Sequence, residues 1–136
     1  ALRMDRICEN TVAVASYMKN HPKVKWVNYA GLPDHPDHAL VQKLMGGRAS
    51  GLMTFGVIGG RVAGERFLDA LNLFTRLVNI GDVRSLATHP ASTTHRQLSA
   101  EELEKSGVTE DTVRLCVGIE HIDDLKEDLE QALSKL

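Results

Sequence analysis

The stretch Gly81-Asp-Val-Arg-Ser-Leu-Ala-Thr-His-Pro-Ala-Ser-Thr-Thr-His95 decides how this chain is organised. It begins with strand-like spacing, because Val83 and Leu86 are apolar anchors, and we predict a strand over residues 79–86. It continues with hydroxyl and imidazole side chains around Pro90, which bury little apolar surface. Backbone amides and hydroxyls in such a loop can hold an anionic ligand group. Packing alone does not account for this stretch, so the sequence indicates a functional loop.

Regular elements are predicted on both sides of this loop. Apolar residues at helical spacing predict helices, alternation predicts strands, and Ser99 with Glu102 forms a capping box that begins a short helix. The other predicted helices are residues 2–20, 37–45, 61–78 and 121–136, and the strands are 23–29, 51–58, 79–86 and 113–117. This interspersed order favours an α+β domain with a small, mainly antiparallel sheet of about four strands packed with helices.

Length and composition restrict the class of protein. A chain of 136 residues is one domain by length, so we assign residues 1–136 to a single domain, and its start at Ala1 suggests a partial chain. The net charge of −2 gives no electrostatic footprint for nucleic acid. The sequence has no long apolar run and no signal-peptide pattern, so we expect a cytoplasmic protein. Its two cysteines, Cys8 and Cys116, are expected to be free thiols.

Arg114 is the most informative charged residue. It interrupts a predicted strand in which Val113, Leu115 and Val117 share one face, so its guanidinium lies on the opposite face. A guanidinium in the middle of a sheet is costly unless it is paired. Two interpretations stay open from the pattern alone: a structural ion pair, or a planar fork that binds a carboxylate.

The six histidines raise the question of a metal site. Two pairs are close in sequence, His35 with His38 and His89 with His95. Neither an H-E-x-x-H helix motif nor a cysteine pair at ligand spacing accompanies them. We therefore predict no metal site.

The opening stretch also carries a resemblance. From Ser85 to His95 it resembles the C-terminal domain of the Cys/Met-metabolism enzymes that use pyridoxal phosphate (PLP). Further stretches that resemble this domain in the same order are Leu2–Arg6, Cys8–Asn10, His21–Val24, Gly31–Pro36, Phe55–Gly60, Asn79–Asp82 and Val113–Ile122. The resemblance covers essentially the whole chain. Two positions depart from it, since Cys8 and Cys116 stand where the family often has His and Ser.

The resemblance implies a fold and a reaction. The fold is the small C-terminal domain of the aspartate-aminotransferase-like (fold type I) enzymes. Within the family the chain is most similar to the O-acetylhomoserine sulfhydrylases, which are homotetramers that convert O-acetyl-L-homoserine and sulfide or methanethiol to homocysteine or methionine and acetate. A cystathionine γ-synthase or methionine γ-lyase type of member is the alternative. A stand-alone α+β binding module is the rival from another class.

Roles for individual residues follow from the resemblance. Arg114 is expected to bind the substrate α-carboxylate, with Ser85 as a second contact and Thr94, together with His95, as weaker candidates for the same pocket. For Thr94 and His95, hydrogen bonds that stabilise the loop are the competing explanation. The seven lysines stand in no context like that of the family's cofactor lysine. We therefore expect no catalytic residue and no bound PLP in residues 1–136, because both belong to an N-terminal domain that these residues lack.

Overall fold

A computed structural model describes the backbone of residues 1–136 and every side chain except those of Ala100 and Glu104. The elements follow in the order α1 (Leu2–Lys19), β1 (Val24–Asn28), α2 (His38–Met45), β2 (Leu52–Val57), α3 (Gly60–Ala70), β3 (Thr75–Arg76), β4 (Leu86–Thr88), the 3₁₀ turn η1 (Pro90–Ser92), α4 (Ala100–Lys105), β5 (Thr112–Cys116) and α5 (Ile122–Leu133). No described helix combines the length and the hydropathy that crossing a lipid bilayer requires.

The strands form one sheet in the order β1-β2-β5-β4-β3. The pairs β1–β2, β2–β5 and β4–β5 are antiparallel, and only the short pair β3–β4 is parallel. The predicted mainly antiparallel α+β architecture is confirmed, with one more strand than expected. The last strand in the sequence, β5, occupies the centre of the sheet.

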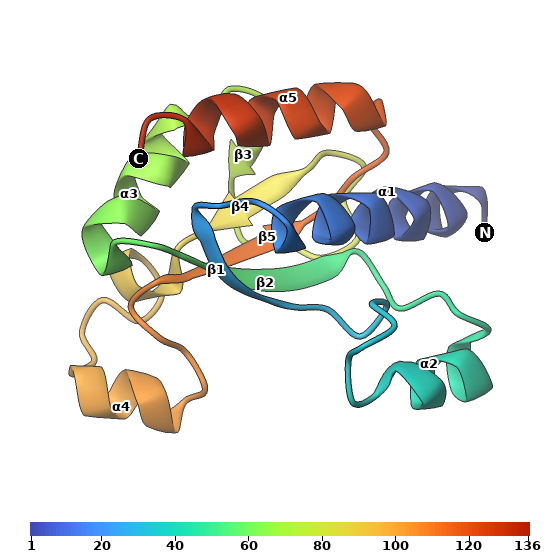
Figure 1. Ribbon diagram of the computed structural model, residues 1–136, viewed down its shortest axis with the longest axis horizontal. Coiled ribbons are helices and arrows are strands. Elements are labelled where there is room, and N and C mark those ends of the chain that lie inside the picture. The colour runs from blue at the N-terminus through green and yellow to red at the C-terminus, as the bar shows by residue number, and fades with distance from the viewer.

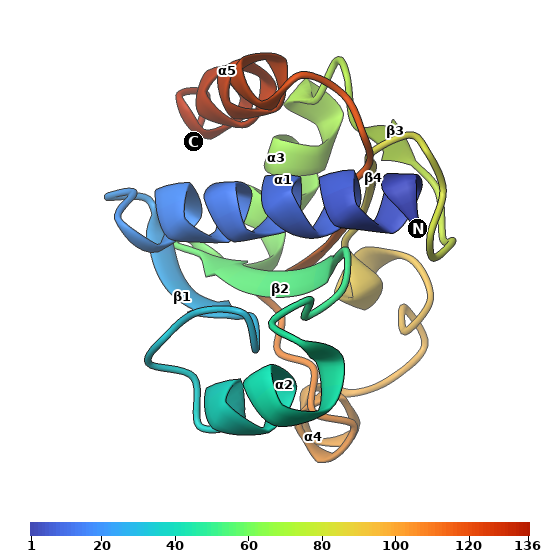
Figure 2. The ribbon, with the colours of Figure 1, turned by 90° about the vertical axis from the view of Figure 1, so that its right-hand side faces the viewer.

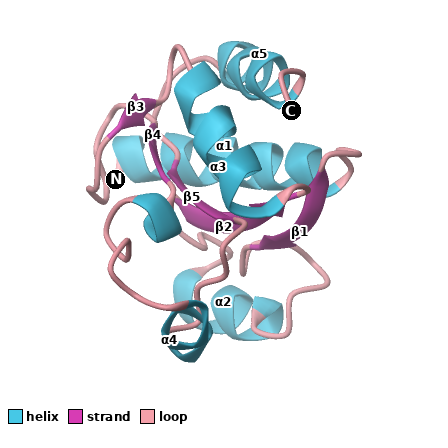
Figure 3. Ribbon diagram, turned by 90° about the vertical axis from the view of Figure 1, so that its left-hand side faces the viewer, coloured by secondary structure: helices cyan, strands magenta, loops and turns pink.

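Three helices cover one face of this sheet. Figures 1 and 3 show α1, α3 and α5 on the same side, whereas α2 and α4 lie on the other side. The core lies between the sheet and the three helices, because the inward-facing strand residues and the apolar helix faces meet there. Its fully buried large side chains include Ile7, Met18, Met53, Phe55, Phe67, Leu115, Leu125 and Leu129.

The opposite face of the sheet is covered only in part. In Figure 2, α2 and α4 lie below the sheet, on the side opposite α1, α3 and α5. Strand alternation directs Thr54 of β2, Thr88 of β4 and Arg114 of β5 toward this side, because Met53, Phe55, Val113 and Leu115 all point into the core. This sparsely covered face is where a polar site can form.

The predicted helix 61–78 is wrong in its second half. Helix α3 ends at Ala70, and Leu71 is extended with φ −67° and ψ 136°. The buried carboxylate of Asp128 on α5 accepts the backbone amides of Asn72, Leu73 and Phe74 at 2.8, 2.9 and 3.0 Å. These bonds replace the helical hydrogen bonds that the apolar pattern predicts, and the chain turns into β3 instead.

The predicted strand 79–86 is also wrong in most of its length. Strand β4 starts only at Leu86, and residues 79–85 form a loop. Local bonds favour the loop: Gly81 has a φ of +74°, which suits glycine, and Asp82 accepts the backbone amide of Arg84 at 3.0 Å. The polar residues in this segment therefore override the weak alternation of its apolar ones.

The other predicted boundaries agree with the structure within a few residues. At the start of α4, Ser99 N–H donates to Glu102 Oε2 at 2.8 Å and Glu102 N–H donates to Ser99 Oγ at 3.4 Å, which is the expected capping box. At the start of α5, the His121 ring accepts the amide of Asp123. The capping box of α4 was predicted from the sequence because Ser99 and Glu102 are three positions apart, whereas the His121 cap was not predicted.

Candidate functional site

Arg114 lies at the centre of the candidate site. It belongs to the central strand β5, where its Cα is paired with Thr54 of β2 on one side and with Thr88 of β4 on the other. Two threonines therefore flank the arginine on the less covered face of the sheet. The side chain of Arg114 is half-buried, so its guanidinium is held by the sheet and still accessible.

The guanidinium of Arg114 is held by neutral groups. Its Nη2 donates to the carbonyl oxygen of Asn79 at 3.4 Å and lies 3.7 Å from Cys116 Sγ. Among the described side chains, no carboxylate lies within 4.0 Å of it. Within these residues the arginine is not part of a structural ion pair, so its charge is available to an external anion.

Ser85 lies at the entrance to β4 with its side chain fully buried. Its backbone N–H donates to Glu120 Oε1 at 2.6 Å, and its hydroxyl donates to Glu120 Oε2 at 2.8 Å. The same hydroxyl accepts the amide of Gly118 at 2.8 Å. A direct bond from Ser85 to a substrate stays a prediction, and it requires one of these donors to leave Glu120.

Thr94 lies in the turn that follows η1, and its side chain is exposed. Its Oγ1 is 2.8 Å from Nδ1 of His95, and the amide of His95 donates to the carbonyl of Pro90 at 2.8 Å. No described contact joins Thr94 to Arg114 or Ser85. These bonds stabilise the loop, while a role for Thr94 toward a substrate stays a prediction.

The histidine that opens this turn, His89, is a core residue. It is fully buried, with Nδ1 2.9 Å from Ser92 Oγ and Nε2 2.8 Å from the carbonyl oxygen of Glu110. Both ring nitrogens therefore have partners within the fold. Among the described residues, no group of three or more His, Cys, Asp or Glu side chains is arranged to hold a metal ion.

The loop 79–85 beside the arginine carries its own ion pair. Arg84 Nη2 lies 3.3 Å from Asp82 Oδ2, and hydrogen bonds from Arg84 lower the pKa of Asp82 to about 2. Asp82 is therefore ionised at neutral pH. Arg84 is exposed, so this pair contributes little to stability.

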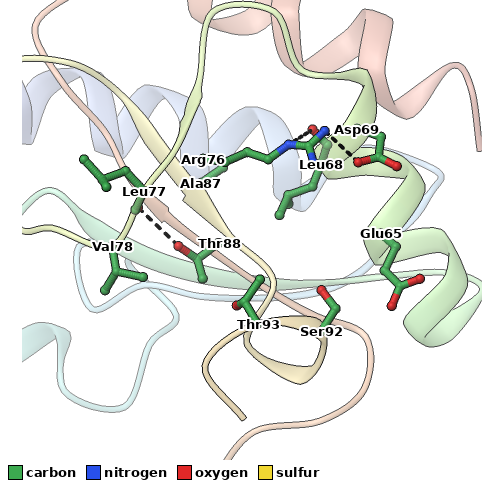
Figure 4. A pocket seen from close by; sticks show the side chains of 10 residues that line it. All are labelled: Glu65, Leu68, Asp69, Arg76, Leu77, Val78, Ala87, Thr88, Ser92 and Thr93. Carbon is green, nitrogen blue, oxygen red and sulfur yellow. Dashed lines mark hydrogen bonds and ion pairs between the residues drawn. The ribbon is translucent and has the colours of Figure 1, made fainter. Parts of the chain in front are cut away.

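A cavity of about 660 Å³ lies between α3 and the strands β3 and β4 (Figure 4). Its lining joins apolar side chains with the acidic Glu65 and Asp69 and with hydroxyls of Thr88, Ser92 and Thr93. Its one arginine, Arg76, is 2.6 Å from Asp69 and donates to the carbonyl of Leu68, as Figure 4 shows. Arg114, Ser85 and Thr94 do not line this cavity, although Thr88, whose Cα is paired with that of Arg114, does.

The lysines of the described chain lie at the surface. Lys19 pairs with Asp34, and Lys23 donates to the carbonyl of Ser134 at 3.4 Å. The other lysines lie on or beside exposed helix and strand surfaces.

The arrangement nearest to a phosphate cradle is at the start of α3, where Lys25, Gly59 and Gly60 line a cavity of about 370 Å³. Glu110 and Asp111 line the same cavity, and Lys25 Nζ is 3.6 Å from Asp111 Oδ2. Two carboxylates oppose the binding of a phosphate. The residues present therefore do not fit PLP, because lysine, phosphate cradle and pyridine partner do not come together.

Three contacts around the site were missed by the sequence analysis. Asn79 contributes a backbone carbonyl, Glu120 contributes a carboxylate, and Cys116 donates its S–H to Asn79 O at 2.9 Å. Glu120 lies in one of the stretches that carry the family resemblance, which was the available signal. The Asn79 carbonyl has no side-chain signal at all, because any residue provides a carbonyl.

Comparison with known proteins places the chain in one group. It matches the family described as Cys/Met metabolism PLP-dependent enzyme over residues 1–134. O-acetyl-L-homoserine sulfhydrylase 1 of Thermus thermophilus is 49% identical over 134 residues, covering 98% of this chain and 32% of that protein. L-methionine gamma-lyase of Pseudomonas deceptionensis is 46% identical over 136 residues, covering 100% of this chain and 34% of that protein.

Solved structures give the same grouping. A crystal structure of an O-acetylhomoserine (thiol)-lyase from Campylobacter jejuni, which contains N'-pyridoxyl-lysine-5'-monophosphate, superposes with a TM-score of 0.90 at 42% identity. The superposition covers 98% of this chain and 32% of the Campylobacter jejuni chain. The chain spans about a third of the length of the curated relatives it matches.

Proposed function

Because the chain belongs to the Cys/Met metabolism family of PLP-dependent enzymes, we propose that residues 1–136 form the substrate-binding C-terminal part of a larger γ-replacement enzyme. The enzyme would convert O-acetyl-L-homoserine and sulfide or methanethiol to homocysteine or methionine and acetate. PLP, held by residues outside this chain, would supply the electron sink for that chemistry. The sulfhydrylases among its relatives support this choice of reaction.

The proposal rests on the position and the contacts of Arg114. Its guanidinium is accessible, is fixed in the central strand and has no carboxylate partner among the described side chains. A planar guanidinium binds a carboxylate with two parallel hydrogen bonds, which fixes both position and orientation. Arg114 would therefore bind the α-carboxylate of the amino-acid substrate and orient the rest of the substrate toward the reacting groups.

The test is substitution of Arg114 in the full-length protein that contains this chain. Removing one partner of a desolvated charge pair costs on the order of 2–5 kcal/mol, so Arg114→Ala should lower kcat/KM for O-acetyl-L-homoserine by roughly 30-fold to several thousandfold. Arg114→Lys should recover only part of this loss, because an ammonium cannot make the paired contact.

Arg66 provides a matched control, because it is exposed on α3. Arg66→Ala should leave kcat/KM unchanged. If Arg114→Ala unfolds the protein while kcat/KM of the folded fraction is intact, Arg114 is a structural residue and the proposal fails.

Methionine γ-elimination is the second candidate reaction, since methionine γ-lyases are among the relatives at similar identity. Assaying the full-length protein with O-acetyl-L-homoserine plus sulfide, and separately with L-methionine alone, decides between the two. Formation of 2-oxobutanoate from methionine, without homocysteine formation in the first assay, would favour the lyase.

The full-length enzyme is also proposed to be a homotetramer. Light scattering of that protein tests this assembly. A large domain encoded upstream of Ala1, with a lysine among small hydroxyl residues, would support the enzyme over a stand-alone binding module.

A further inference from the structure

We infer that Glu120 is a positioning residue for Arg114, acting through the loop 79–85. This inference rests on the proposed function, because it concerns the same carboxylate site. Glu120 follows β5 and does not touch the guanidinium in any described contact. It fixes the loop whose backbone carbonyl receives that guanidinium.

One end of the loop is bound to the segment that carries Glu120. The carboxylate of Glu120 accepts both the backbone amide and the hydroxyl of Ser85, at 2.6 and 2.8 Å. The amide of Ile119 donates to the carbonyl of Val83 at 2.9 Å, and the amide of Gly118 donates to Ser85 Oγ at 2.8 Å. Hydrogen bonds to a charged acceptor are stronger than neutral ones, so Glu120 contributes most to this attachment.

The attachment is itself fixed to helix α1. The side-chain amide of Asn10, which is buried, donates to the carbonyls of Gly118 and Glu120 at 3.0 and 2.9 Å. A Cβ on Gly118 would lie 2.5 Å from Glu120 Oε2 and 2.6 Å from the carbonyl carbon of Arg84. The loop and the segment after β5 are therefore packed so closely that only glycine fits between them.

The other end of the loop meets the arginine. The carbonyl of Asn79 accepts the S–H of Cys116 at 2.9 Å and an N–H of Arg114 at 3.4 Å. Both donors belong to the same strand, β5, that leads to Glu120. The loop thus connects β5 to the segment 118–120 that follows this strand, and the orientation of its Asn79 carbonyl depends on how firmly Ser85 is held at the far end.

The consequence concerns the geometry of the arginine and not its charge. Arg114 has no described carboxylate to hold it, so the Asn79 carbonyl and the Cys116 sulfur determine where its fork points. Releasing Ser85 from Glu120 would let the loop shift and the guanidinium take up other rotamers. Binding of a carboxylate would then weaken, while contacts to other parts of a ligand would persist.

The experiment compares an acid with its amide on the PLP-loaded full-length protein. L-Norleucine has no γ leaving group, and its carboxamide lacks the carboxylate, so calorimetric Kd values for the two isolate the carboxylate contact. Glu120→Gln keeps the size of the side chain but presents an amide NH₂ to one of the two Ser85 donors. We expect the Kd for norleucine to rise about tenfold and that for the carboxamide to change less than about twofold. Glu127→Gln removes a negative charge at an exposed position of α5, and it should change neither Kd.

Each outcome decides the inference. Equal weakening of acid and amide, no weakening, or tighter binding of the acid would overturn it, the last showing that Glu120 competes with substrate. Arg114→Ala is measured alongside: if it leaves norleucine binding intact, the proposed function fails as well, whereas an effect of Arg114→Ala without one of Glu120→Gln refutes only the positioning role. If Glu120→Gln does not fold, Glu120→Asp replaces it, because aspartate keeps the charge on a shorter side chain. The inference then requires that Glu120→Asp weaken the binding of norleucine more than that of its carboxamide.

Discussion

The carboxylate of Asp128 on α5 accepts the backbone amide of Leu73 at 2.9 Å, across 55 positions of sequence. Because the same carboxylate also binds the neighbouring amides of Asn72 and Phe74, it satisfies three backbone donors where the chain leaves α3. A side chain of one helix thus determines where another helix ends and where the edge strand β3 begins.

We expect Asp128→Ala to lower the free energy of unfolding by about 3 kcal/mol or more, because three backbone donors lose a charged acceptor. Asp128→Asn should cost less, since one oxygen can still accept. Urea denaturation followed by circular dichroism measures both. The neighbouring substitution Glu127→Gln removes a charge at an exposed position and should have little effect; equal losses in the two would mean that only net charge matters.

Gly64→Ala should destabilise the protein by about 1–3 kcal/mol through overpacking. A Cβ at position 64 would lie 2.6 Å from Cδ2 of His89, which is fixed by its bond to the Glu110 carbonyl. His89→Ala should also destabilise the fold, because two ring partners are lost. Thermal unfolding of the double variant should show less destabilisation than the two single losses added together, and simple additivity would refute the contact.

Asp111 should make stability depend on pH in the acid range. Burial opposes its ionisation, but hydrogen bonds from Thr109 and Trp26 and the nearby Lys25 outweigh burial, so the pKa of Asp111 lies below its ordinary value. The folded state therefore favours the charged form, and this contribution is present at neutral pH and is lost as the pH falls below the ordinary aspartate pKa of about 3.9.

Urea midpoints measured from pH 7 down to pH 3 test this contribution. Asp111→Asn should lower the urea midpoint at neutral pH. It should also make the midpoint fall less steeply between pH 7 and pH 3. Asp37→Asn, at an exposed position, serves as the comparison. If the urea midpoint of Asp111→Asn falls as steeply toward pH 3 as that of the unsubstituted protein, the acid dependence of stability comes from other groups.

Residues 1–136 alone should not bind PLP specifically, because the described lysines lie at the surface and Lys25, which lines a cavity, faces Asp111 at 3.6 Å. Incubation with PLP, borohydride reduction and peptide mass measurement should give scattered, substoichiometric adducts. One stoichiometric adduct at a single lysine would show that this part of the protein holds the cofactor itself.

Patterns within a few residues predicted much of the fold. The strands β1, β2 and β5 could be predicted because alternation records which face is buried, and the cap of α4 could be predicted because Ser99 and Glu102 are three positions apart. The end of α3 could not, because it depends on a carboxylate on α5. The apolar pattern of residues 71–78 is compatible with a helix, and only the distant Asp128 makes the alternative more stable.

The candidate site, too, could be predicted from the sequence only in part. Strand alternation was enough to place Arg114 on the face opposite Val113 and Leu115, as the structure shows. The contacts that hold its guanidinium were not predictable, because the Asn79 carbonyl belongs to a loop whose path depends on Glu120. The substrate roles of Arg114, Ser85 and Thr94 stay predictions, and the variants described above test the first of them directly.

The central position of β5 governs how a nascent chain can fold. Of the five strands in residues 1–136, β5 leaves the ribosome last, and yet it must be inserted between β2 and β4. Until residues 112–116 arrive, both neighbours present unpaired strand edges, which are templates for association with other chains. Folding of the sheet must therefore wait for the synthesis of residues 112–116, so a translational pause or truncation before Thr112 should leave an aggregation-prone intermediate that chaperones recognise.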